Sequence, residues 1–136
     1  MANEAVLMIE SEIPVNMTCA DGAGIERGAI CKMTDPNTAV LADGDEDIVA
    51  GIAANEKIAS NGLTSIAIYR GGDFKVVLCG SCTVGDALIT NASSGGSNTV
   101  LTAGVNAEDI IGIAKETGAE GETILMELKP RTNNLA

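Results

Sequence analysis

The sequence contains no histidine, and this absence excludes many enzyme classes at once. Histidine supplies the usual general base near neutral pH, so Ser-His and Cys-His nucleophile pairs and the common zinc-hydrolase sites are missing. There is also no P-loop and no serine nucleophile elbow. The glycine-rich stretch 22–28 resembles a dinucleotide fingerprint, but it carries one residue too many and precedes no long helix. We therefore expect no catalytic activity and no cofactor.

Aromatic and basic residues are equally scarce. Tyr69 and Phe74 are the only aromatic side chains, and 8 basic residues face 19 acidic ones, which gives a net charge of −11. Two aromatics cannot build a stacking platform for single strands, and no basic stripe is present to bind phosphates. DNA and anionic membranes would repel such a surface. We expect neither nucleic acid nor membrane as a partner.

We expect no targeting signal from the first residues of the sequence. Met1–Glu4 contains no basic region, and the apolar run Ala5–Ile9 is too short for a signal peptide or a membrane span. The sequence therefore predicts a protein made and used in a cytosol without export, where its four cysteines would stay reduced.

What the sequence does contain is typical of a β protein. Its 46% hydrophobic residues are mainly Ala, Ile, Val and Leu, and 16 glycines favour short strands joined by tight turns. No window has a long helical period, so helix is expected only as single turns at Asn55–Ala59 and Ala107–Asp109. The predicted strands are Val15–Cys19, Ala29–Met33, Ile48–Ala54, Ser65–Arg70, Asp73–Leu78, Ala87–Thr90, Ile110–Ala114 and Thr123–Lys129.

A faint internal repeat organises these strands. Each half contains a turn with glycine, a strand, an apolar-Gly-Ile-Ala strand, another glycine turn and a final strand. The first copy consists of 25–30, 49–53 and 62–68, and the second of 83–88, 110–114 and 121–128. Chance similarity among short Gly/Ala/Ile strings is the alternative. The order of three matched blocks favours a duplicated β unit.

The N-terminus is set apart by its composition. A uniform apolar run needs cover on both faces or a sheet edge to join, and an acidic break separates this run from the rest. We divide the chain into an extended N-terminal arm (1–14), a single β-rich domain (15–130) and a C-terminal tail (131–136). The arm residues expected to contact another protein or a second copy are Ala5, Val6, Leu7, Met8, Ile9, Ile13 and Pro14. The alternative is that the arm packs on its own domain as an edge strand.

Two segments allow other chemistry. Cys79-Gly80-Ser81-Cys82 has redox or zinc spacing, with Cys19 and Cys31 as further thiols. However, no βαβ pattern surrounds it and no second close pair exists, so we interpret all four as small packing residues. The acidic stretch 43–47 could hold calcium, but its spacing does not match an EF-hand loop, and it is typical of a solvated turn.

The second half of the chain resembles a known group. The motifs are Tyr69–Lys75 (aromatic-x-Gly-Gly-x-Phe), Thr83–Leu88 (x-Val-Gly-Asp-x-apolar), Ile111–Glu116 and Gly121–Leu128. Together they resemble the small capsid-decoration, or cement, proteins of tailed bacteriophages, over residues 25–130. The opening Met1–Leu7 is similar to N-termini in that group.

The resemblance implies both a fold and a role. It implies a compact β-tulip-like or β-barrel-like domain that forms trimers at three-fold or quasi-three-fold axes on the outer surface of the expanded capsid. There it would bind the major capsid protein and stabilise the shell against DNA pressure, so its place would be the virion, after synthesis in the bacterial host cytoplasm. A head-fibre base, a tail-associated protein and, further off, a cysteine-based redox or metal protein remain alternatives.

Overall fold

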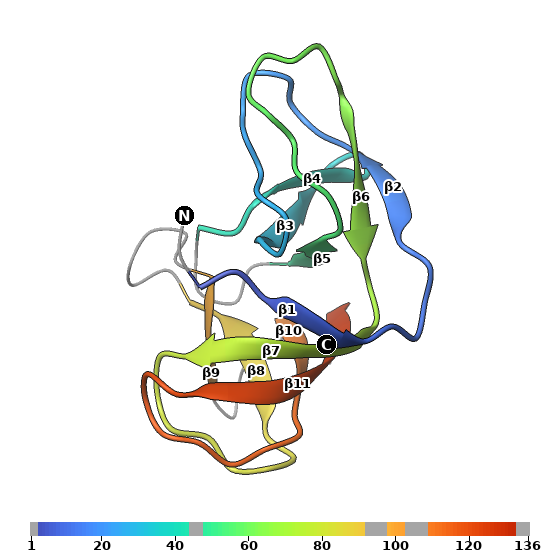
Figure 1. Cartoon of the computed structure of the whole chain (residues 1–136). Helices are drawn as coiled ribbons and strands as arrows, with labels where there is room; N and C mark the ends of the chain where they lie inside the picture. Colours follow the sequence, from blue (N-terminus) through green and yellow to red (C-terminus); the bar gives the residue numbers. More distant parts are fainter. Residues whose placement is uncertain (1–2, 44–47, 92–97, 103–108, 133–136) are drawn as a thin grey trace.

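The computed structural model describes residues 3–43, 48–91, 98–102 and 109–132, and this part of the chain is all β. It contains eleven strands, coloured along the sequence in Figure 1. Their bounds are β1 (Val6–Ile9), β2 (Val15–Thr18), β3 (Ile30–Thr34), β4 (Thr38–Leu41), β5 (Val49–Ala53), β6 (Ser65–Tyr69), β7 (Gly72–Leu78), β8 (Ala87–Thr90), β9 (Thr99–Thr102), β10 (Asp109–Ala114) and β11 (Thr123–Thr132). No helix long and apolar enough to cross a bilayer occurs among these residues.

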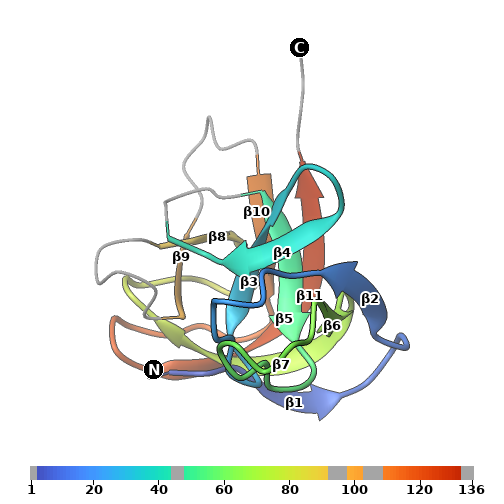
Figure 2. The ribbon, with the colours of Figure 1, turned by 90° about the horizontal axis from the view of Figure 1, so that it is seen from above.

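The strands form two barrels with the same connectivity. The first barrel closes in the order β2-β4-β3-β5-β6, and the second in the order β7-β9-β8-β10-β11. In each barrel the first strand pairs with the third in parallel and with the fifth antiparallel. In Figure 1 the first barrel lies above the second, and Figures 1 and 2 both show β1 running along β7. The mostly β, barrel-like fold predicted from the sequence is confirmed.

The predicted repeat is confirmed down to single hydrogen bonds. Gly28 donates its amide to Ala53 (2.9 Å), and Gly85 donates its amide to Ala114 (2.7 Å). The isolated bridge between Ile25 and Lys57 in the first half corresponds to the bridge between Cys82 and Gly118 in the second. The two halves therefore share one backbone arrangement, although few of their side chains are identical.

One core extends through both barrels. Its buried members include Ile30, Val49 and Ile52 from the first barrel and Phe74 and Met126 from the second. A second cluster fills the first barrel with small and medium side chains, among them Met17, Cys19, Cys31 and Ile66. Because the larger cluster takes residues from both halves, the barrels pack as one unit.

The far end of the first barrel is held together by a buried lysine. The Lys57 side chain is 1% exposed, and its Nζ donates to the Asp21 carbonyl (2.9 Å), to Asp21 Oδ1 (3.1 Å) and to the Ile58 carbonyl (2.7 Å). Asp21 Oδ1 also accepts the Gly62 amide at 2.7 Å. These contacts join the β2–β3 and β5–β6 loops at the top of Figure 1.

Several sequence-based boundaries change. The predicted helical turn at Asn55–Ala59 is wrong, because Lys57 instead forms a β-bridge with Ile25. The second predicted turn falls on residues outside those described, except Asp109, which begins β10. Strands β4 and β9 were not predicted. Strand β11 continues to Thr132, into the stretch expected as a C-terminal tail.

Candidate functional site

The arm residues Ala5–Ile9 lie on the chain's own second barrel. Strand β1 pairs antiparallel with β7, with Val6 opposite Lys75, Leu7 opposite Phe74 and Ile9 opposite Asp73. This is the edge-strand alternative left open by the sequence, and contacts of the arm with another chain stay a prediction. In the described part of the chain β1 pairs only with β7, so its outer edge has no strand beside it.

Both ends of the apolar run Ala5–Ile9 approach a glycine closely. The Ala5 amide donates to the Gly28 carbonyl at 2.8 Å, and a Cβ on Gly28 would lie 2.5 Å from the Ala5 carbonyl oxygen. At the other end, a Cβ on Gly72 would lie 2.7 Å from the Ile9 carbonyl oxygen. Gly28 precedes β3 of the first barrel and Gly72 begins β7, so β1 spans the junction between the barrels.

The two faces of the arm differ in burial. Ala5 is buried and Leu7 packs against the main core, whereas Val6, Met8 and Ile9 are more than half exposed. In the linker to β2, Ile13 is 84% exposed and Pro14 is half-buried. The structure therefore divides the seven predicted contact residues between the run Ala5–Ile9 and the linker to β2, and only some of them face solvent.

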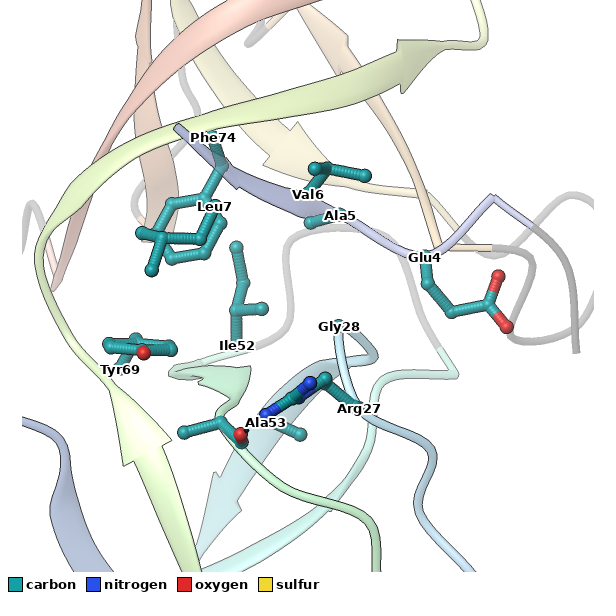
Figure 3. Close-up of a pocket in the computed structure, with 11 residues that line it drawn as sticks. Glu4, Ala5, Val6, Leu7, Arg27, Gly28, Ile52, Ala53, Tyr69 and Phe74 are labelled. Carbon is teal, nitrogen blue, oxygen red and sulfur yellow. Dashed lines mark hydrogen bonds between the residues drawn. The ribbon is translucent and has the colours of Figure 1, made fainter. Parts of the chain in front are cut away.

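A pocket of about 480 Å³ lies beneath the inner face of the arm. In Figure 3, Leu7 and Phe74 bound one side of this pocket, Tyr69, Ala53 and Arg27 bound the other, and Ile52 lies between them. The Arg27 Nε donates to the Ala54 carbonyl at 3.3 Å, which holds the guanidinium at the pocket wall. The floor is thus apolar, and Glu4 and Arg27 bring charge to its rim.

Both aromatic residues of the chain line this pocket. The Tyr69 and Phe74 rings meet edge to face, with centroids 5.6 Å apart. The pKa of Tyr69 is raised, first because partial burial disfavours the phenolate and then because Glu10 hydrogen-bonds its hydroxyl. Arg27, Tyr69 and Phe74 were not predicted from the sequence as neighbours of the arm. The available signal was that Tyr69 and Phe74 are the only aromatic residues and lie five positions apart in the sequence, which indicates that they could pack together.

The cysteines are all free thiols. Cys19 and Cys31 are buried in the first barrel, Cys82 is buried in the shared core, and Cys79 is half-exposed. Burial, with the nearby Cys19 thiol adding to it, raises the pKa of Cys31 to about 12. Within the described residues no cluster of three metal-ligating side chains occurs. The candidate calcium stretch lies outside these residues except Asp43, which pairs with Lys32 at 2.6 Å.

Comparisons with known proteins support the fold. No family model matches the sequence, and no curated protein matches it either. Among solved structures, the chain is similar to the crystal structure of the N base of the head fibre protein gp8.5 of bacteriophage phi29. The identity is 18% and the TM-score is 0.53, over 85% of this chain and 93% of that one.

Proposed function

We propose that this chain is a non-catalytic structural protein of a phage virion, attached to the outer surface of the capsid. The observation that carries the proposal is the shared fold with a phage head-fibre base, which extends over most of both chains. The decoration-protein motifs of the sequence support the same role independently.

The surface of the molecule suits such a role. Contacts with a capsid or with neighbouring copies use exposed apolar residues on a rigid scaffold, and here Val6, Met8, Ile9 and Ile13 are exposed along one short segment. The net charge of −11 fits a partner that presents lysine or arginine, such as the major capsid protein. We further propose assembly as a homotrimer at three-fold or quasi-three-fold axes, where several weak contacts act together and stabilise the shell.

Binding to shells is the direct test. Purified protein is mixed with expanded, undecorated capsids, and co-sedimentation is followed by imaging of the particles. Ile13→Asp should weaken binding, whereas the matched variant Ile58→Asp, at an isoleucine 60% exposed in the β5–β6 loop, should bind like the wild type. If the wild type does not bind, or if its density lies inside the shell, the proposal is wrong.

The same comparison favours a second candidate, the base of a head fibre, because the similar structure is itself a fibre base. Both candidates place the chain on the capsid surface. Imaging distinguishes them. Density for a fibre base would lie at the foot of a projecting fibre, whereas density for a decoration protein would repeat over the capsid lattice as low protrusions.

A further inference from the structure

We propose that copies of this chain meet through the outer face of strands β1, β7 and β11. This inference rests on the self-assembly in the proposed function and names its surface. The β-register defines this face, because directly paired residues on neighbouring strands point to the same side. One row contains Val6, Lys75 and Leu125, and the next contains Ile9, Asp73 and Glu127.

The apolar part of this face is accessible. Val6 is 57% exposed and Ile9 59% exposed, and Leu125 on β11 is half-buried. The outer edge of β1 adds unpaired backbone groups within the described part of the chain. Unpaired edges with apolar side chains are sites where another chain adds on.

The charges of the face are paired, either with each other or with Lys115 and Glu116, which directly follow β10. Lys115 Nζ lies 2.8 Å from Asp73 Oδ2, Lys75 Nζ lies 3.5 Å from Glu116 Oε1, and Lys129 Nζ lies 3.7 Å from Glu127 Oε2. The pKa of Lys115 is raised, mainly by its hydrogen bond to Asp73, which is consistent with this pairing. Three positive and three negative charges therefore cancel on this one surface.

This balance identifies the partner as a second copy. Since the six charges sum to zero, the rest of the chain carries the whole net charge of −11. Two such molecules repel wherever their acidic surfaces meet, so they approach most easily through a neutral, partly apolar face. A basic capsid surface would instead be attracted most strongly to the acidic remainder of the molecule.

Light scattering against protein concentration tests the inference. Leu125→Lys places an unpaired charge on the face, and Ile58→Lys changes the net charge equally on an exposed loop far from it. The wild type and Ile58→Lys should associate at the same protein concentration. Leu125→Lys should associate only at a protein concentration about tenfold higher or more. Val6→Lys, at a more exposed site, repeats the test in case Leu125→Lys does not fold, as judged by circular dichroism.

Salt provides a second readout. Association should strengthen as the salt concentration rises, because screening reduces the repulsion between the acidic surfaces. The same screening weakens contacts through a neutral face only slightly. Association by both face variants at the wild-type concentration, association that weakens with salt, or a wild type that stays monomeric at every soluble concentration would each overturn the inference.

Shell binding, measured separately, distinguishes the two proposals. If the protein self-associates through this face but does not bind shells, the inference stands and the proposed function fails. If the face variants assemble normally but lose shell binding, the face belongs to the capsid protein and the inference is wrong.

Discussion

Lys57 shows how a single residue can distinguish two halves that share a backbone plan. Its counterpart across the repeat is Gly118, which has no side chain to reach the neighbouring loop. A buried ammonium group is tolerated only when acceptors surround it, and Lys57 has three. The loops of the first barrel therefore depend on one side chain in a way that those of the second do not.

Replacing this lysine should be costly. Lys57→Met leaves the Asp21 and Ile58 carbonyls without their donor, and we expect it to lower the free energy of unfolding by about 2–4 kcal/mol in urea denaturation. Lys129→Met, at a side chain 55% exposed, should change it by less than about 0.5 kcal/mol. Equal effects of the two variants would mean that the buried contacts contribute nothing.

The same pair predicts a pH dependence. The pKa of Asp21 is lowered, mainly by its hydrogen bond from Lys57 and next by the Gly62 amide. A carboxyl group with a depressed folded-state pKa stabilises the fold above its unfolded value, near pH 4, and loses this effect as pH falls through the folded value. The stability gap between wild type and Lys57→Met should therefore narrow below about pH 4. A constant gap across an acid titration would contradict this assignment.

The cysteines should react in the order of their exposure. A thiolate is the reactive form, so Cys31, with its pKa raised to about 12, should resist alkylation until the protein unfolds. Cys79 is half-exposed and should be modified first in the native protein, which mass spectrometry after brief labelling can measure. Cys79→Ala should remove this early modification and leave shell binding intact. Rapid native labelling of Cys31 would contradict the packing role.

At the scale of the element, strands of clear alternation or buried apolar character could be predicted from the sequence, and two strands could not. Thr38–Leu41 and Thr99–Thr102 are four-residue strands, and each pairs antiparallel with the strand before it and in parallel with β2 or β7. Four residues are too few to show a clear alternation, and the parallel pairing that closes each barrel is non-local, so neither leaves a pattern in the sequence. The helical turn expected at Asn55–Ala59 failed for a related reason, because a distant bridge to Ile25 fixes that backbone.

The candidate site was predictable only in part. Composition located the apolar arm, because a uniform hydrophobic run at a terminus needs a partner surface. It could not identify that surface, since the glycines at 28 and 72 that admit the arm backbone resemble ordinary turn glycines in the sequence. Nor could it place Arg27 beside Tyr69 and Phe74, which come from separate strands and loops.

The repeat offers a matched test of how the arm is held. Gly28 and Gly85 occupy equivalent positions with φ of 86° and 93°, but only at Gly28 would a Cβ meet other atoms within 4 Å, those of the arm. Gly28→Ala and Gly85→Ala should share a strain cost of about 1 kcal/mol, and Gly28→Ala alone should displace the arm. Hydrogen exchange at the Ala5 amide is the measurement. Equal protection in both variants would show that the arm does not depend on this approach.

At the scale of the whole molecule, two barrels of the same plan do not behave as two domains. Ile30, Val49 and Ile52 of the first barrel pack in the same buried cluster as the core residues of the second. A side-chain hydrogen bond reinforces this, because the Ile30 amide donates to Asn98 Oδ1 at 3.0 Å across the two halves. The arm adds a third connection, from Gly28 to β7.

A shared core of this kind predicts a single cooperative unfolding transition. If the barrels separated before unfolding, Phe74, Leu128 and their neighbours would be exposed to water, which is unfavourable by roughly 25 cal/mol for each Å² of apolar surface. Calorimetry should therefore give equal calorimetric and van't Hoff enthalpies. Ile52→Ala, at a residue 1% exposed, should lower the free energy of unfolding by about 2–4 kcal/mol while keeping one transition. Two resolved transitions in the wild type, or a variant that melts only one barrel, would mean that the halves are stable independently and that the common core is incidental.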